Sequence, residues 1–165
     1  MNGVSAMSAG QQIGQPAREG GFFKLWMKVA IVALVFAAAA MILGPVIWPP
    51  AEGGPEPTSM QLASFIILAA ITSLTFGLGV SFLVFGLPLV RHFAGSKPMA
   101  WAMYLSIGWL LVSWWPHASL HGHIHDNVQQ LLSVEYGFHV PSYVAGIVLA
   151  YCFLSLSRER SGMSS

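Results

Sequence analysis

The fold is decided by a stretch near the N-terminus that runs from Val29 to Ala51 and reads VAIVALVFAAAAMILGPVIWPPA. It contains no Asp, Glu, Lys or Arg. Because an α-helix rises about 1.5 Å per residue, about 20 apolar residues suffice to cross the hydrocarbon core of a bilayer. This stretch is therefore long enough for one membrane-spanning helix.

Three further stretches of the chain also lack charged side chains: Pro57–Val90, Pro98–His125 and Tyr136–Ser157. Each is longer than one crossing requires. Their apolar residues are continuous, whereas the strands of a membrane barrel alternate between apolar and polar residues. We therefore predict an all-α integral membrane protein, a four-helix bundle with spans at about 25–48, 60–93, 99–116 and 141–156.

The composition of the whole chain agrees with this prediction. Charged residues make up 8% of the sequence and hydrophobic residues 55%, and the mean hydropathy is +0.66. Soluble domains carry about 25% charged residues, so an ordinary soluble domain is excluded. The net charge is +1, with no basic face or stripe of the kind that nucleic-acid binding needs. We expect the lipid bilayer, and no nucleic acid, as a partner.

The basic residues indicate the orientation of the spans. All seven Lys and Arg residues lie at or near the start of the first predicted span, around the connection between the second and third, or after the fourth. The first connection contains acidic residues and the third contains acidic residues and histidines, and neither contains Lys or Arg. Basic residues collect on the cytoplasmic side of membrane proteins. We predict a multi-pass protein of the plasma (cytoplasmic) membrane with cytoplasmic N and C termini and a His-rich, extracytoplasmic third connection.

The two ends of the chain are predicted to be tails. Residues 1–21 are rich in Gly, Ser, Gln and Ala and show no periodic apolar pattern. We expect them to form a mobile cytoplasmic tail. Residues 22–157 would be the transmembrane domain, and residues 158–165 a short cytoplasmic tail.

The second predicted span carries small residues on one face. Gly79 and Gly86 are seven residues apart, and Ala69, Ala70 and Ser73 lie further along the helix. Small side chains let the backbone of a neighbouring helix approach closely. We expect this face to pack against another helix.

The candidate site is the histidine-rich third connection. Five histidines occur within 23 residues: His117, His121, His123, His125 and His139. Neutral imidazole is a common ligand of transition metals, and short His-rich tracts are typical of metal binding. We predict that these histidines bind a transition metal ion, with copper, zinc and iron all open.

Two local structures would bring different histidines together. If the helix continues past Pro116, then His117, His121 and His125 form one stripe. If Gly122 ends the helix, His121, His123 and His125 line one side of an extended segment. The third and fourth spans are antiparallel, so His139 would lie beside this segment in either case.

Two acidic residues accompany the histidines. Asp126 and Glu135 are expected to supply an oxygen ligand or to accept an imidazole N–H from a coordinated histidine. Residues 128–136 are amphipathic and predict a short helix lying on the outer membrane surface.

Haem b is the alternative cofactor, with His117 and His139 as its axial ligands. Nothing identifies a catalytic residue, and the four uncharged stretches contain no charged residue of the kind found in transport pathways. The function that we expect is a small integral membrane subunit or accessory protein that holds a metal ion for a membrane oxidoreductase or for metal delivery. The alternatives are a non-catalytic structural subunit of a larger membrane complex, a haem b-binding subunit and, less strongly favoured, an enzyme in its own right. Other membrane subunits or further copies of the chain are the expected protein partners.

Overall fold

The computed structural model describes residues 19–49, 57–124 and 127–162, and within these ranges the chain is helical and has no strand. The predicted all-α class is therefore confirmed. The five helices are α1 (Glu19–Ile47), α2 (Ser59–Phe93), α3 (Lys97–Val112), α4 (Trp114–His123) and α5 (Val128–Gly162).

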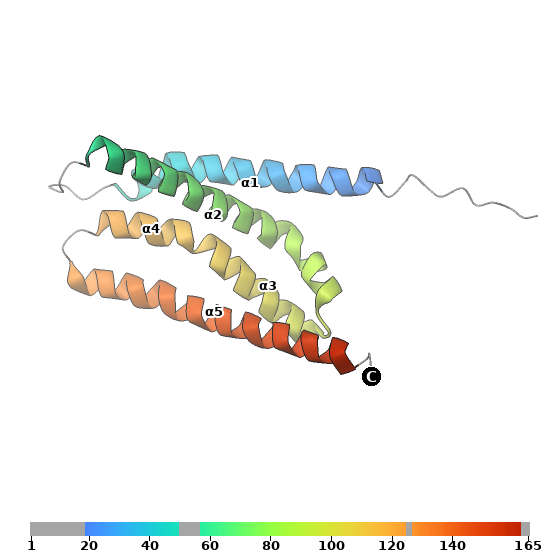
Figure 1. Ribbon diagram of the computed structural model, residues 1–165. Coiled ribbons are helices and arrows are strands. Elements are labelled where there is room, and N and C mark those ends of the chain that lie inside the picture. Colours follow the sequence, from blue (N-terminus) through green and yellow to red (C-terminus); the bar gives the residue numbers. More distant parts are fainter. Residues whose placement is uncertain (1–18, 50–56, 125–126, 163–165) are drawn as a thin grey trace, which may run out of the picture.

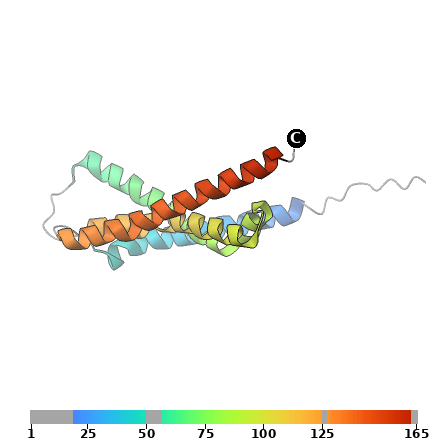
Figure 2. The ribbon, with the colours of Figure 1, turned by 90° about the horizontal axis from the view of Figure 1, so that it is seen from below.

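The helices lie side by side in an up-and-down arrangement (Figure 1). Helices α3 and α4 follow each other end to end and together form one bent rod between α2 and α5. The start of α1 and the end of α5 lie at the same end of the molecule, and the end of α4 and the start of α5 lie at the other end. Figure 2 shows that the N-terminal part of α2 and the C-terminal part of α5 splay away from the other helices.

Three helical segments are long and apolar enough to cross a membrane: Lys24–Ile47, Ser59–Phe93 and Val128–Arg158. Many of their large apolar side chains face outward, and Ile42, for example, is 70% exposed. The buried positions are filled mainly by small residues, among them Ala33, Ala40, Ser73 and Ser81. Small residues inside and large apolar residues outside are typical of helices that pack within lipid.

The predicted third span, 99–116, is divided between two helices. Helix α3 ends at Val112, and α4 begins at Trp114. Pro116 explains the break, because proline has no N–H to bond the carbonyl of Val112 and its ring crowds that carbonyl. Hydrogen bonds from Ser113 N to Trp109 O (3.0 Å) and from His117 N to Ser113 O (3.1 Å) still connect the two helices.

The predicted fourth span, 141–156, is only the middle of α5. The segment 128–136 was expected to be a separate helix on the membrane surface, but it forms the first turns of α5. Pro141 lies inside this helix instead of starting it. One proline removes a single backbone donor, which a long apolar helix tolerates.

The other predicted boundaries change less. Glu19 to Gly21 belong to α1, so the N-terminal tail is at least three residues shorter than predicted. Helix α5 likewise continues to Gly162, into the predicted C-terminal tail. The remainder of both tails, residues 1–18 and 163–165, is not part of the described chain.

Glycines allow α2 to approach two other helices closely. A Cβ atom on Gly77 would lie 2.1 Å from the carbonyl oxygen of Ala33 in α1, and one on Gly79 would lie 2.8 Å from Cβ of Leu111 in α3. The expectation for Gly79 is thus confirmed. Gly86 differs, because its nearest neighbour is the ring of Phe82 in its own helix. Ser81 adds a direct link, since its hydroxyl donates a hydrogen bond of 3.0 Å to the carbonyl of Val29.

Candidate functional site

Two pairs of side chains face each other where α4 lies against the first turns of α5. His117 and His121 are one helical turn apart on α4, and Glu135 and His139 are one turn apart on α5. Residues four positions apart share one face of a helix. The antiparallel arrangement of α4 and α5 brings these two faces together. We call these four residues the histidine cluster.

Short distances join all four members of the histidine cluster. Nε2 of His121 lies 2.9 Å from Oε1 of Glu135 and 3.0 Å from Nε2 of His117. Nδ1 of His139 lies 2.6 Å from Oε2 of Glu135 and 3.1 Å from its main-chain oxygen. The rings of His117 and His139 meet edge to face, with their centroids 4.9 Å apart. The carboxylate of Glu135 is thus held between histidines of both helices.

These contacts assign the protons on the rings. The carbonyl and carboxylate oxygens of Glu135 accept hydrogen bonds, so Nδ1 of His139 donates and its Nε2 is left for another partner. Nε2 of His121 likewise donates to Glu135, and Nε2 of His117 can then accept from His121. Nε2 of His139 therefore keeps a lone pair for a metal ion, and the lone pair on Nε2 of His117 becomes available to the ion when His121 donates to Glu135 alone.

The surroundings of His117 favour its neutral form. Burial lowers the pKa of His117 below the ordinary value of 6.5, and the positive charges that His121 and His139 can carry lower it further, while Glu135 opposes the shift. Phe138 contributes to this burial, with its ring centroid 5.2 Å from that of His117. Neutral imidazole is the form that binds a metal ion.

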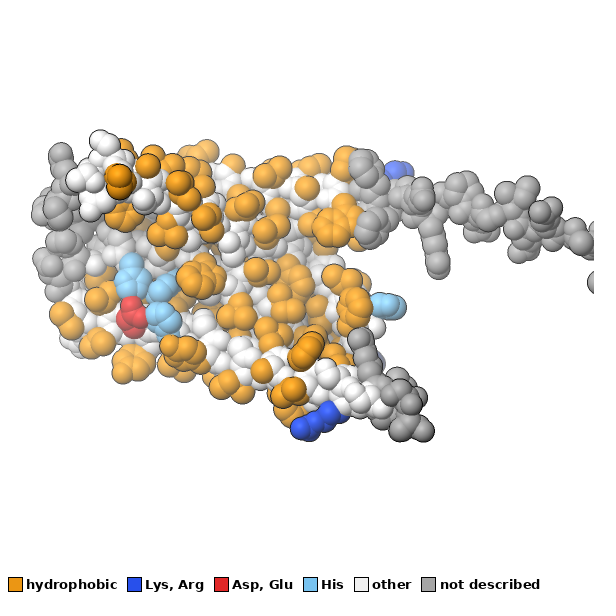
Figure 3. Space-filling model, in the orientation of Figure 1, with side chains coloured by type: hydrophobic (Ala, Val, Ile, Leu, Met, Phe, Trp, Pro, Cys, Tyr) orange, Lys and Arg blue, Asp and Glu red, His pale blue; other side chains and the backbone are white. Residues whose placement is uncertain are grey.

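The histidine cluster is open on one side. The side chains of His121, Glu135 and His139 are 35%, 37% and 44% exposed. Figure 3 shows histidines and an acidic side chain together on the surface, with hydrophobic side chains around them. The cluster is therefore partly exposed at the surface of the protein instead of being enclosed between the helices.

Three members of the histidine cluster can offer ligand atoms to a single ion. One ligand atom from each of His117, Glu135 and His139 can be chosen so that all three lie within 4.8 Å of one another. Two imidazoles and one carboxylate are a donor set that suits zinc and other divalent transition metals.

The structure places the other predicted ligands elsewhere or does not describe them. Helix α4 continues through Gly122 to His123, so the extended arrangement of His121 and His123 does not form. Nδ1 of His123 lies 2.7 Å from the carbonyl oxygen of Pro49, at the end of α1, instead of joining the cluster. His125 and Asp126 fall outside the described residues.

Glu135 takes a more central position than the sequence indicated. It contacts two histidines directly, in agreement with the expectation that it accepts an imidazole N–H, and it does so from both helices of the cluster. Its spacing of four residues from His139 was the available signal. That signal counts only if both residues lie on one helix, and α5 was predicted to begin later, at residue 141.

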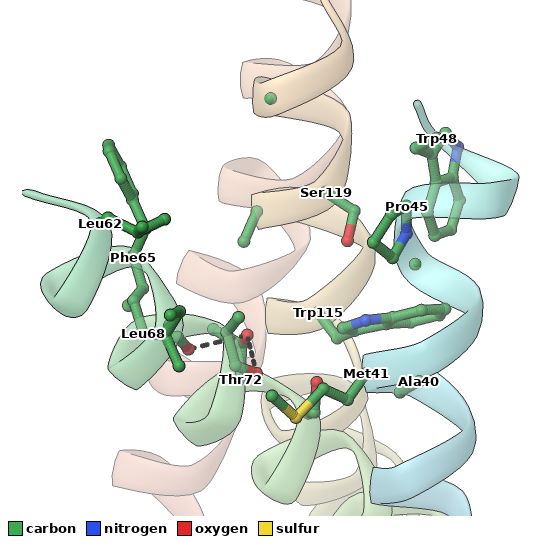
Figure 4. Close-up of a pocket in the computed structure, with 16 residues that line it drawn as sticks. Ala40, Met41, Pro45, Trp48, Leu62, Phe65, Leu68, Thr72, Trp115 and Ser119 are labelled. Atoms are coloured by element: carbon green, nitrogen blue, oxygen red, sulfur yellow. Dashed lines mark hydrogen bonds between the residues drawn. The ribbon is translucent and has the colours of Figure 1, made fainter. Parts of the chain in front are cut away.

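A cavity of about 560 Å³ lies on the opposite side of α4 (Figure 4). Its walls are mostly apolar and come from α1, α2 and α4. The hydroxyl of Thr72 in this wall donates to the carbonyls of Leu68 and Ala69 in its own helix. Helix α4 therefore has the histidine cluster on one side and the cavity on the other, with Trp115, Ala118, Ser119 and Gly122 lining the cavity.

Comparison with known proteins gives no relative: no protein-family model, curated protein or solved structure matches the chain. The histidine cluster is therefore the feature of the molecule that indicates a function.

Proposed function

We propose that this chain is a small four-pass membrane protein that holds a transition metal ion at its extracytoplasmic face. It would act as a subunit or accessory protein that serves a membrane oxidoreductase or delivers the metal to one. The single observation that carries this proposal is the meeting of His117, His121, Glu135 and His139 from two helices.

The four-pass topology is supported by the course of the chain. Helix α2 ends and α5 begins at opposite ends of the molecule. If these two long helices cross the membrane, the bent rod of α3 and α4 must cross it as well. The two helices contain 16 and 10 residues, and at about 1.5 Å per residue their combined length of about 39 Å is sufficient.

The orientation is supported by the distribution of charge. Lys24, Lys28, Arg91, Lys97 and Arg158 all lie toward the end of the bundle that carries the start of α1 and the end of α5. The positive-inside rule makes this end cytoplasmic. The histidine cluster lies toward the opposite, extracytoplasmic end.

The geometry favours an ion over haem b. The axial ligands of a haem lie on opposite faces of its macrocycle. The rings of His117 and His139 are in edge-to-face contact, and Nε2 of His121 touches that of His117. This arrangement leaves no slot for a macrocycle between the two proposed axial ligands.

Metal analysis of the detergent-purified full-length protein tests the proposal. We expect about one transition metal ion per chain, and loss of this ion in His117→Ala and His139→Ala. His123→Ala is the matched control from the same helix, because His123 contacts Pro49 instead of the cluster. His92→Ala, at the far end of α2, is the second control.

Equal, low metal content in the unmodified protein and in all four variants would contradict the proposal. A non-catalytic structural subunit would then be the better interpretation. Fluorescence-detected gel filtration of each variant shows whether it is folded, so that loss of metal can be distinguished from loss of structure.

A further inference from the structure

The number of protein ligands decides what a bound ion can do. A metal ion enclosed by four protein ligands serves structure, whereas an ion with three protein ligands keeps a position for water or another small ligand. The histidine cluster contains four residues with suitable side chains. The question is therefore whether His121 is a ligand.

The contacts of His121 argue that it is not a ligand. Its Nε2 lies 2.9 Å from Oε1 of Glu135, an atom that only accepts hydrogen bonds. The proton is thus on Nε2 of His121, and this nitrogen has no lone pair for an ion. Its second neighbour, Nε2 of His117 at 3.0 Å, is placed to accept the same proton.

The other three residues present lone pairs. The ligand atoms of His117, Glu135 and His139 can all lie within 4.8 Å of one another. Nδ1 of His139 can donate to the main-chain oxygen of Glu135, at 3.1 Å, which leaves Nε2 of His139 for the ion. The carboxylate of Glu135 leaves its contact with Nδ1 when it turns to the same ion. A coordinated histidine that donates its other N–H to a carbonyl or carboxylate is the usual arrangement in metal sites.

We propose that the ion is held by three protein ligands, His117, Glu135 and His139, and keeps one coordination position for water or a small anion from the outer aqueous phase. His121 is a positioning residue, whose N–H fixes the carboxylate of Glu135. The inference rests on the proposed metal-binding function and specifies the coordination of that same ion. The exposure of Glu135 (37%) and His139 (44%) gives an incoming ligand access.

The open position is tested with the full-length protein in detergent, loaded with Co²⁺ alone and titrated with azide. The visible absorption of Co²⁺ reports the number and type of its ligands. We expect a saturable change of this absorption as azide replaces water. A spectrum that azide leaves unchanged would overturn the open position.

The role of His121 is tested by the same substitution at three positions: His117→Gln, His121→Gln and His139→Gln. The amide of Gln can donate a hydrogen bond to Glu135 but is a poor ligand for a transition metal. We expect His121→Gln to bind Co²⁺ and azide nearly as the unmodified protein does, whereas the other two variants lose the ion. His121→Ala, which cannot donate, should bind Co²⁺ about 10–100-fold more weakly but still at one ion per chain.

The outcomes separate this inference from the function on which it rests. If the unmodified protein binds no Co²⁺ and contains no other metal, the proposed function fails and this inference fails with it. If it binds Co²⁺ but His121→Gln loses the ion as completely as His117→Gln, His121 is a ligand and only this inference is overturned. Thermal unfolding of each variant in detergent identifies any that does not fold.

Discussion

The lone pair of His117 depends on where its ring lies. The ring is partly buried and lies beside two other imidazoles, which together lower its pKa below 6.5. A folded protein that resists protonation of His117 binds fewer protons than the unfolded chain does when the pH falls below 6.5. The stability that His117 contributes is therefore fully present above pH 6.5, its ordinary pKa. It is lost as the pH falls through the lowered pKa that His117 has in the folded protein.

We predict that acid destabilises the metal-free protein. Between about pH 8 and about pH 5, the melting temperature in detergent with a chelator should fall as His117 is forced to take up a proton. His117→Gln removes the titrating group, so its melting temperature should fall less over the same range. His123→Gln is the control and should follow the unmodified protein. Identical pH profiles for all three proteins would contradict the assigned role of burial.

For individual residues of the site, the sequence predicted the residue types better than their roles. His117, His121 and His139 were predicted to come together because of their spacing and the antiparallel helices, and the structure brings them together. His123 was separated from them by the continuation of α4 for one residue beyond Gly122. A single residue at the end of a helix changes which face a side chain occupies, and sequence patterns do not fix helix ends that closely.

The packing of the helices against one another depends on a small number of positions at which two backbones lie close together. Gly77 is the closest of these, because a Cβ atom there would lie 2.1 Å from the main-chain oxygen of Ala33 and 2.8 Å from the main-chain nitrogen of Ala37. Backbone atoms cannot move aside as a flexible side chain can. A side chain at Gly77 therefore requires α1 and α2 to move apart.

We predict that Gly77→Ala destabilises the protein by about 1–3 kcal/mol or more, the usual cost of overpacking a close contact. Gly146→Ala is the matched control, since a Cβ atom on Gly146 of α5 would have no neighbour within 4 Å. Replacing a glycine inside a helix with alanine at such an open position should leave stability unchanged or raise it slightly. Unfolding of both variants in detergent measures the difference. Equal stability of the two variants would show that α1 and α2 do not pack through Gly77.

The existence of the helices was predictable from the sequence, but their bounds were not always so. Long uncharged stretches placed α2 and the end of α1 to within one residue, because the hydropathy of the residues decides where such a helix lies, whereas α1 starts six residues before the predicted position 25. Proline was the source of the larger errors. Pro141 was taken as the start of a helix that it does not interrupt, and the predicted span to Pro116 concealed a break at Ser113.

The arrangement of the whole molecule follows from the order of the helices. Short connections make neighbouring helices antiparallel, so their alternating directions were predictable from the order of the long apolar stretches. The bent rod of α3 and α4 was not predictable from the sequence. Helix α3 alone has 16 residues, and the uncharged stretch that contains it continues without interruption into the histidines. His117 and His121, which follow the bend, lie against the first turns of α5.

Labelling of single cysteines tests this topology in intact cells. With Cys152→Ala as the background, Ser133→Cys in the first turns of α5 should react with a membrane-impermeant maleimide added outside. Ser96→Cys, between α2 and α3, should react only after the membrane is permeabilised. Both positions are exposed, so a difference in labelling reports the side of the membrane and not burial. Labelling of Ser96→Cys from outside would refute the orientation.

The most direct test of the metal-binding proposal is an anomalous diffraction map of the crystallised protein, collected at the absorption edge of the metal found in it. The proposal predicts one strong peak about 2.0–2.2 Å from ligand atoms of His117, Glu135 and His139, with His121 beside Glu135 and farther from the ion. A map without a peak among these residues, from a crystal that contains the metal, would contradict it.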